Sequence, residues 1–257
     1  MGNLAELSLR KKIALAAARQ AGKLLLDRFG HINKIKSKGD RDMVTDIDLA
    51  AESIIKNQII KNFPCDSIIS EENSRQRISD YKWIVDPMDG THNYIHNINI
   101  FGTSIALAYK DEVVLGVIYM PQDEELYWAQ KKKGAYLNSK PISVSARNIK
   151  QATLIFDSSL RYQKVRMLKG MSNLVDKVFN LRMFGSTVRG LSYVAEGKAE
   201  LEVEYNDKVW DFAAGLLLVE EAGGRVTDLK GNKWCINSKG YIASNGKIHR
   251  EILSLLK

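Results

Sequence analysis

The sequence predicts a mixed fold of the α+β or α/β class, built from two halves that pack together as one unit. Three observations support this class. The chain begins with two long segments whose apolar residues recur with helical spacing. A run of short, β-rich segments follows, and after about residue 145 strands and helices alternate. We therefore expect an N-terminal half over residues 1–145 and a C-terminal half over residues 146–257.

Composition limits the class of protein. The 257 residues are 45% hydrophobic and 26% charged, which is typical of a globular protein with a sizeable core. No apolar run approaches the roughly 20 residues of a membrane span, and the N-terminus lacks a secretory signal. The two cysteines match no disulfide framework or metal site. These features favour a cytoplasmic protein without membrane contact. The net charge of +8 suits an anionic substrate or nucleic acid, although solvated lysines explain it more simply.

Two helices are predicted at the start of the chain. The first covers residues 4–29, and Gly30 is placed to end it. The residues expected on its buried face are Leu9, Ile13, Ala17 and Leu24. After a charged loop over residues 34–42, Thr45 or Asp46 caps the second helix. Its expected buried stripe is Ile47, Ala51, Ile54, Ile55 and Ile59.

The following segments are predicted as strands where β-branched and aromatic residues dominate between turn residues. In the N-terminal half the expected strands are residues 67–70, 82–86, 103–109, 113–119, 125–129 and 135–137. In the C-terminal half they are residues 152–156, 181–184, 199–203, 225–227 and 241–243. The helices expected in the C-terminal half are residues 165–177, 188–195, 210–222 and 248–256.

The segment from Asp86 to Thr91 carries the strongest chemical signal. It reads Asp-Pro-Met-Asp-Gly-Thr and follows an apolar, β-branched run. Pro87 lacks an N–H and Gly90 permits a turn, so Asp86 and Asp89 are expected at the end of a strand. Close carboxylates repel each other unless a cation lies between them or one is protonated. Taken alone, however, such residues also serve as ordinary turns and helix caps.

Two further acidic residues stand at the ends of other elements. Glu71 follows the strand before this segment, and Asp211 opens a helix behind Trp210. Carboxylate ligands without His or Cys favour Mg²⁺ over zinc. The backbone amides of Gly90 and Thr91 offer a place for a phosphate. The residues therefore predict a Mg²⁺-phosphate site, which is suited to phosphoester hydrolysis.

Taken together, these residues resemble the inositol monophosphatase family. The resemblance rests, in chain order, on Val44-Thr45-Asp46-Ile47-Asp48, Glu71-Glu72, the segment Asp86 to Thr91, Trp210-Asp211 and Glu221-Ala222-Gly223-Gly224. It covers nearly the whole chain. It implies a layered αβαβα sandwich, a homodimer, and hydrolysis of a small phosphate monoester with Mg²⁺. Inhibition by lithium, typical of the family, is implied as well.

The resemblance also implies roles for individual residues. The implied ligands, for two to three Mg²⁺ per site, are Glu71, Asp86, the Met88 carbonyl, Asp89 and Asp211. Asp48 and Thr91 match the pair that activates the attacking water, and Glu71 joins them as a catalytic residue. The implied phosphate and substrate contacts are Asp89, Gly90, Thr91, Gly185, Ser186, Thr187, Glu204 and Asp211.

The physiological substrate stays open between several members of this class. Inositol monophosphate or a similar small sugar or polyol phosphate is the first expectation, because His92-Asn93-Tyr94 after the Asp-Gly-Thr motif is closer to the inositol type. The alternatives are fructose 1,6-bisphosphate (possibly as a dual activity), histidinol phosphate and 3'-phosphoadenosine 5'-phosphate. A role of a different class is that of a protein partner in RNA synthesis or processing, which the positive charge permits. A purely structural domain would leave the acidic residues as caps and turns.

Five basic side chains near the motifs have open roles. His92 is either an exposed loop residue or a contact to phosphate or substrate, and His96 packs or caps. Arg189 either lies on a helix surface or points into the site, where it would favour a second phosphate. Lys36 and Lys38 either approach a bound anion or belong to a solvated face.

Overall fold

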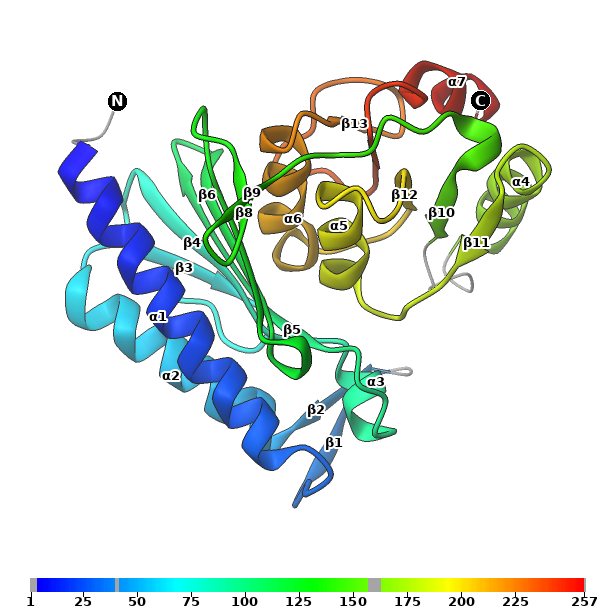
Figure 1. Cartoon of the computed structure of the whole chain (residues 1–257). Helices are drawn as coiled ribbons and strands as arrows, with labels where there is room; N and C mark the ends of the chain where they lie inside the picture. The colour runs from blue at the N-terminus through cyan, green and yellow to red at the C-terminus, as the bar shows by residue number, and fades with distance from the viewer. Residues whose placement is uncertain (1–3, 40–41, 157–162, 257) are drawn as a thin grey trace.

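The computed structural model describes residues 4–39, 42–156 and 163–256 of the chain (Figure 1). Its helices and sheets form five layers in the order α, β, α, β, α, so the layered sandwich implied by the resemblance is confirmed. The helices are α1 (Leu4–Arg28), α2 (Asp46–Asn62), α3 (Thr91–Ile95), α4 (Lys164–Val175), α5 (Thr187–Ala195), α6 (Val209–Glu221) and α7 (His249–Leu255). None of the described helices combines the length and the apolar character that crossing a membrane requires.

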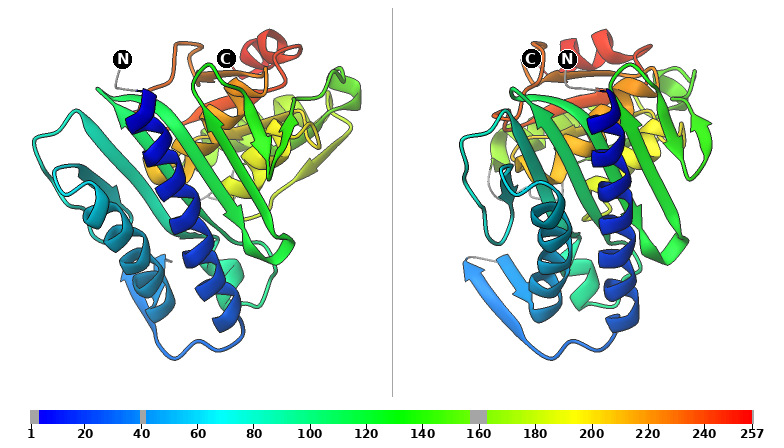
Figure 2. Two further views of the ribbon diagram at one scale, coloured as in Figure 1. Left: turned by 60° about the vertical axis from the view of Figure 1, so that its left-hand side comes forward. Right: turned by 90° about the vertical axis from the view of Figure 1, so that its left-hand side faces the viewer.

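A seven-stranded sheet forms the second layer, with strand order β3-β4-β5-β6-β7-β8-β9. Its strands are β3 (Ser67–Ser70), β4 (Tyr81–Asp89), β5 (Gly102–Tyr109), β6 (Glu112–Met120), β7 (Glu125–Gln130), β8 (Ala135–Leu137) and β9 (Lys140–Ile142). Strands β3 and β4 run parallel, and the remaining neighbours are antiparallel. Helices α1 and α2 cover one face of this sheet, as the rotated views show (Figure 2).

A five-stranded sheet forms the fourth layer, with strand order β11-β10-β12-β14-β13. Its strands are β10 (Thr153–Phe156), β11 (Asn180–Arg182), β12 (Leu201–Glu204), β13 (Arg225–Asp228) and β14 (Tyr241–Ser244). Helices α5 and α6 pack between the two sheets, and α4 and α7 cover the outer face of the smaller sheet (Figure 1). The largest apolar core therefore lies between the sheets, where both halves of the chain contribute to it.

The segment over residues 34–42 was predicted as a charged loop, and this was wrong for its described part, since residues 35–39 and 42 belong to two paired strands. Strands β1 (Ile35–Gly39) and β2 (Asp42–Thr45) pair antiparallel in a separate two-stranded sheet. All five residues of β1 are exposed. An exposed strand needs no apolar alternation, and the sequence signal for strands was consequently absent. The hairpin matters because it carries Lys38 toward the acidic residues described below.

The first helix buries most of the predicted face, since Ala17 is fully buried and Ile13 and Leu24 are partly buried against the core. Leu9, expected in the core, is 46% exposed, whereas Ala14, Ala18 and Ala21 are fully buried. A Cβ atom on Gly22 would come within 2.3 Å of the Tyr119 ring on β6. Small side chains therefore let α1 approach the sheet closely. The stripe predicted for α2 is also correct, since four of its five residues are buried and Ile54 is partly buried.

Strand β4 does not stop at Asp86, as predicted, but continues to Asp89 with an irregularity. Its pairing with β5 is regular from Tyr81 to Asp86, shifts register, and resumes where Asp89 pairs with Gly102. Pro87 occupies the irregular stretch and cannot donate to the ladder. Because of this bulge, Asp86, the Met88 carbonyl and Asp89 all point toward one region at the end of the sheet.

Candidate active site

The sequence motifs meet at one cavity of about 250 Å³ between the two halves of the chain. The N-terminal half contributes the ends of β3 and β4 and the start of α3. The C-terminal half contributes the N-termini of α5 and α6 together with β10 and β12. The residues predicted for the site that line the cavity are Glu71, Asp86, Met88, Asp89, Gly90, Thr91, Gly185, Ser186, Thr187, Glu204 and Asp211. Asp48 is the one predicted residue outside this lining, and it reaches the cavity through Thr91.

Three carboxylates converge at the centre of the cavity. Asp86, Asp89 and Asp211 each place an oxygen within 4.8 Å of the other two. No His or Cys belongs to this group, so the donor set is hard and anionic and suits a cation such as Mg²⁺. Asp86 and Asp89 come from the bulged end of β4, and Asp211 comes from the first turn of α6.

The titration of these groups reflects their burial and mutual repulsion. The pKa of Asp89 is raised to about 7, chiefly by burial and also by the nearby Asp211, against hydrogen bonds that lower it. The pKa of Asp86 lies well above its usual value because of burial, with Glu71, Asp211 and Asp89 adding to the effect. Burial, followed by the neighbouring Asp207, likewise raises the pKa of Asp211 well above its usual value. Such a cluster is stabilised by a bound cation, which removes the repulsion.

The turn at Gly90 brings the backbone close to the segment just before β5. Gly90 has a φ of 85° in the left-handed region, and a Cβ atom there would lie 2.7 Å from the Ile100 carbonyl oxygen. Any side chain would therefore clash with the backbone, which explains the glycine. The turn leads directly into α3, and Gly90, Thr91 and His92 all line the cavity.

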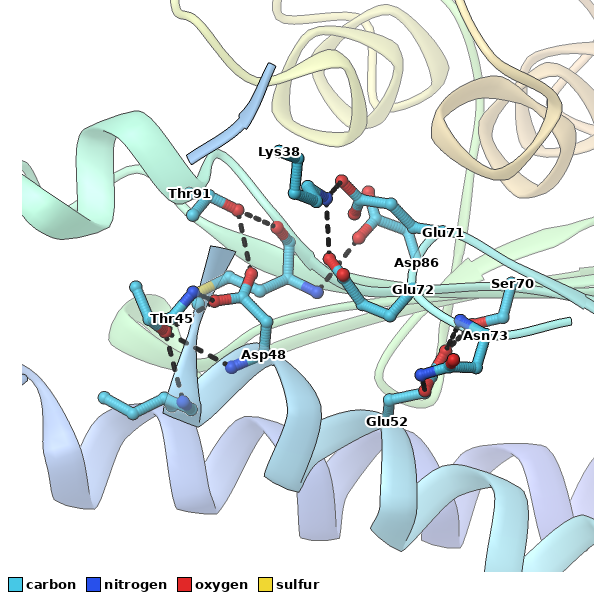
Figure 3. Close-up of polar contacts among 12 residues, drawn as sticks. Lys38, Thr45, Asp48, Glu52, Ser70, Glu71, Glu72, Asn73, Asp86 and Thr91 are labelled. Carbon is cyan, nitrogen blue, oxygen red and sulfur yellow. Dashed lines mark hydrogen bonds and ion pairs between the residues drawn. The ribbon is translucent and has the colours of Figure 1, made fainter. Parts of the chain in front are cut away.

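Glu71 belongs to an acidic turn that two other elements hold in place (Figure 3). The Lys38 ammonium group from the hairpin pairs with Glu71 at 2.6 Å and with Glu72 at 2.7 Å. On the other side of the turn, Glu52 of α2 accepts hydrogen bonds from the Ser70 hydroxyl and from the Asn73 backbone N–H at 2.9 Å. Glu52 thus fixes both ends of the acidic turn. The role of Lys38, left open by the sequence, is that of a partner to these carboxylates.

Thr91 and Asp48 form a second polar unit beside the carboxylates (Figure 3). The Thr91 Oγ1 atom lies 3.0 Å from Asp48 Oδ1 and 2.9 Å from the Met88 carbonyl oxygen. Because both partners are acceptors, they engage the hydroxyl proton, and a lone pair of Oγ1 remains for another donor. Asp48 is fully buried and also accepts from the Thr45 backbone N–H at 2.8 Å. Burial raises the pKa of Asp48, and its hydrogen bonds oppose that shift.

The C-terminal half holds Asp89 from the opposite side. The Ser186 hydroxyl donates to Asp89 Oδ1, and the Thr187 backbone N–H donates to Asp89 Oδ2 at 3.1 Å. Ser186 is the N-cap of α5, so Asp89 lies at a helix N-terminus, where a negative charge is favoured. The Asn93 amide ties the same segments together by donating to the Phe184 carbonyl at 2.8 Å. The loop at Gly185 is thereby fixed against α3.

Sequence reasoning missed several residues of the cavity wall. Asp207 lines the cavity, accepts a hydrogen bond from the Thr187 hydroxyl at 3.1 Å and lies beside Asp211. Glu202 and Phe156 line it as well. The expected substrate contact at Glu204 could have pointed to Glu202, which stands two residues earlier on β12 and also lines the cavity.

The structure shows where Arg189 and Lys36 lie, whose roles the sequence left open. Arg189 is 3% exposed and pairs with Glu125 at 2.7 Å and with Asp123. It is neither a surface residue nor part of the cavity lining, so both readings from the sequence were wrong. Lys36 lies on the exposed strand β1 and is not among the lining residues.

The comparisons with known proteins agree with this geometry. The profile of the inositol monophosphatase family matches residues 6–257. The chain is 33% identical to "Fructose-1,6-bisphosphatase/inositol-1-monophosphatase" of Thermotoga maritima, covering 96% of this chain and 95% of that protein. It is also 33% identical to "Nus factor SuhB" of Escherichia coli, covering 95% and 94% of the two chains. The solved structure of extragenic suppressor protein suhB from Bartonella henselae has a TM-score of 0.92 at 35% identity, covering 96% of this chain and 97% of that one.

The fold and the clustered carboxylates define a metal-dependent phosphatase. The chain belongs to the inositol monophosphatase family. It is accordingly a phosphoric monoester hydrolase, and the first function expected from the sequence is confirmed at the level of this reaction class.

Proposed function

We propose that this protein hydrolyses inositol monophosphate or a similar small sugar or polyol phosphate, with Mg²⁺ as its cofactor. The observation that carries the proposal is the convergence of Asp86, Asp89 and Asp211 within 4.8 Å beside the backbone turn at Gly90 and Thr91. Its relative in Thermotoga maritima carries a name for activity on both inositol 1-phosphate and fructose 1,6-bisphosphate. Fructose 1,6-bisphosphate is therefore the first alternative substrate, and histidinol phosphate and 3'-phosphoadenosine 5'-phosphate follow it.

Two to three Mg²⁺ ions fit the chemistry of the donors. Glu71, Asp86, Asp89 and Asp211 would hold them together with the Met88 carbonyl oxygen, and all five line the cavity. The raised pKa values of Asp86, Asp89 and Asp211, caused first by burial and then by neighbouring carboxylates, support a cation there. When bound, Mg²⁺ supplies positive charge that orients and polarises the phosphate and acidifies a water molecule. Lithium would inhibit by competing for one of these positions.

Thr91 and Asp48 would receive the proton of the attacking water. The Thr91 hydroxyl proton is engaged by Asp48 and by the Met88 carbonyl, so its oxygen can accept a hydrogen bond from a water in the cavity. As the water loses its proton to Thr91, the Thr91 proton passes to Asp48. Burial raises the pKa of Asp48, so its carboxylate accepts a proton more readily than an exposed aspartate does. Glu71 would orient the same water from the other side of the cavity.

The wall from the C-terminal half would bind the alcohol part of the substrate. Gly185, Ser186, Thr187 and Glu204 line this side of the cavity. Ser186 and Thr187 already hold Asp89 through their hydroxyl and backbone N–H groups, so they would position the substrate partly through that carboxylate. Glu204, 7% exposed, can accept hydrogen bonds from hydroxyl groups of a polyol.

Phosphate release with Mg²⁺ tests this function directly. The substrates would be inositol 1-phosphate, fructose 1,6-bisphosphate, histidinol phosphate and 3'-phosphoadenosine 5'-phosphate. Asp89→Asn serves as the inactive variant and Asp111→Asn, an exposed aspartate on a hairpin, as its matched control. We expect turnover of inositol 1-phosphate that is lost only in Asp89→Asn and is reduced by lithium. No release from any of the four substrates by folded, Mg²⁺-loaded protein would contradict the proposal.

We propose that the protein is a homodimer in the cytoplasm. An apolar surface on α4 and next to β11 supports the dimer, because Val165 is 83% exposed and Phe179 is 75% exposed. Sedimentation of the wild type and of Phe179→Glu tests it. A wild-type protein that sediments as a monomer at micromolar concentration would exclude the dimer.

A role as a protein partner in RNA synthesis is the second candidate, because the Escherichia coli relative is named a Nus factor. The two functions make opposite predictions for Asp89→Asn. If the cell needs only the phosphatase, this variant fails to complement deletion of the gene. Complementation by an Asp89→Asn protein that releases no phosphate would favour the partner role.

A further inference from the structure

Two histidines lie side by side at the opening of the cavity. His92 lies in α3 and His96, one helical turn later, caps its C-terminus; the His96 backbone N–H donates to the His92 carbonyl at 3.2 Å. Their ring centroids are 4.3 Å apart, with 59° between the ring planes. Both side chains are exposed, and His92 also lines the cavity. The pair therefore faces solvent at the edge of the candidate active site.

Neither ring has another role among the described residues. Within residues 4–39, 42–156 and 163–256, no hydrogen bond or ion pair engages either imidazole, and each ring packs against the other. The buried His249 shows the contrast, since its two ring nitrogens lie 3.0 Å from the Thr227 hydroxyl and 2.8 Å from the Ser244 hydroxyl. The nitrogens of His92 and His96 thus remain available to an external ligand.

Two imidazoles at positions i and i+4 of one helical turn can chelate a single metal ion. Zinc–nitrogen bonds of about 2.0–2.1 Å on a tetrahedral ion place the two nitrogens roughly 3.3 Å apart. Rings whose centroids are 4.3 Å apart are close enough for one nitrogen of each to bind the same ion. Imidazole favours borderline ions such as Zn²⁺, Cu²⁺ and Ni²⁺, whereas the carboxylates deeper in the cavity favour Mg²⁺. The two sites therefore differ in the ions that they select.

We propose that His92 and His96 form a bidentate site for a borderline transition-metal ion such as Zn²⁺. An ion held there stands at the opening of the cavity beside Thr91. It narrows the path by which a phosphate ester reaches the carboxylates, and it lowers the rate of hydrolysis. Metal binding depends on the two histidines alone, whereas inhibition of hydrolysis by the bound ion rests on the proposed phosphatase function.

Competition with a zinc-sensitive dye measures the binding part, using the full chain in saturating Mg²⁺. The variants are His96→Ala and, as a matched control, His31→Ala, which removes another exposed histidine. We expect His96→Ala to bind Zn²⁺ about tenfold or more weakly, because it loses the chelate, and His31→Ala to bind as the wild type does. The same result is expected in an Asp89→Asn background, where the carboxylate site is impaired. Equal zinc affinity in wild type, His96→Ala and the double variant His92→Ala/His96→Ala would overturn the proposal.

The inhibitory part is measured as the zinc concentration that halves phosphate release, relative to the zinc-free rate of each variant. We expect this concentration to rise in His96→Ala by the same factor as the dissociation constant. Unchanged inhibition in His96→Ala, despite weakened zinc binding, would refute the obstruction of the cavity. If no phosphate ester is hydrolysed, the dye competition still decides the metal site, so failure of the proposed function and failure of the site are distinguishable. Circular dichroism melting confirms that the variants are folded.

Discussion

Replacement of Asp89 by Asn should change the pH dependence of stability of the metal-free protein in a defined direction. Burial raises the pKa of Asp89 from 3.8 to about 7, so the folded state binds this proton more tightly than the unfolded state does. Stability contributed by the proton is present below the unfolded pKa and is lost as pH rises through the folded pKa. Ionisation of Asp89 without a metal therefore destabilises the fold between about pH 4 and pH 7. Asn cannot ionise and escapes this loss.

The size of the effect follows from the two pKa values. The difference between 3.8 and about 7 amounts to roughly 4 kcal/mol, at about 1.4 kcal/mol for each pH unit. Of this, about 2 kcal/mol falls between pH 5.5 and pH 8, because the loss is complete once pH exceeds the folded pKa. The variant also weakens the hydrogen bonds from Ser186 and Thr187. That cost is nearly independent of pH, so the change with pH isolates the carboxylate.

Urea unfolding in EDTA at several pH values between 5.5 and 8 measures this effect. We expect the free energy of unfolding of Asp89→Asn, relative to the wild type, to increase by about 2 kcal/mol across this range. The titration of groups away from the cluster, such as His249, cancels in the difference between the two proteins, whereas Asp86 and Asp211, which are coupled to Asp89, add to the difference in the same direction. Saturating Mg²⁺ should reverse the order at pH 8, because only the wild type gains the binding free energy. Parallel curves for the two proteins in EDTA would refute the interpretation of Asp89 as a strained, ionised ligand.

Three other substitutions separate chemistry from architecture. Thr91→Val removes the hydroxyl between the attacking water and Asp48. Steady-state phosphate release should show kcat reduced by about 10²–10⁴-fold, and a loss smaller than tenfold would exclude Thr91 from proton transfer. Glu52→Gln weakens the hydrogen bonds that hold the turn at Glu71, so calorimetric titration should show weaker Mg²⁺ binding. Unchanged Mg²⁺ affinity would show that the turn keeps its position without Glu52. Glu221→Ala leaves three backbone N–H groups of residues 132–134 without their acceptor. It should lower the free energy of unfolding by about 1–3 kcal/mol in urea without changing kcat, and a loss of kcat would show that this hairpin communicates with the site.

Local signals explain which elements the sequence predicts correctly. Thr45 caps α2 with its side chain, and Asp48 completes the capping box by accepting from the Thr45 backbone N–H. This pattern is readable from four consecutive residues, and the predicted start of the helix is correct. The hairpin of β1 and β2 offers no such signal, because all five residues of β1 are exposed and do not alternate between apolar and polar. Its existence depends on contacts that form only in the folded chain.

The candidate site divides in the same way. Asp86, Asp89 and Glu71 were identifiable because each stands at the end of a predicted strand, and their motif is specific to a family. Asp207 has no comparable signal, since it lies in the turn before α6 and reaches the cavity only when the two halves pack together. The burial of Arg189 was equally unreadable, because it depends on acidic partners in and beside β7, more than sixty residues away.

The carboxylate cluster is pre-formed because helix N-termini offset part of its repulsion. Asp89 accepts from the Thr187 backbone N–H at the start of α5, and Asp211 accepts from the Lys208 backbone N–H at the start of α6. Positive helix ends thus face two of the three carboxylates. Backbone donors orient these oxygens before any cation arrives, so little reorganisation is needed when one binds. The pKa values of Asp89 and Asp211 nevertheless remain raised, chiefly by burial. The helices therefore fix the geometry of the site and leave its charge for a cation to neutralise.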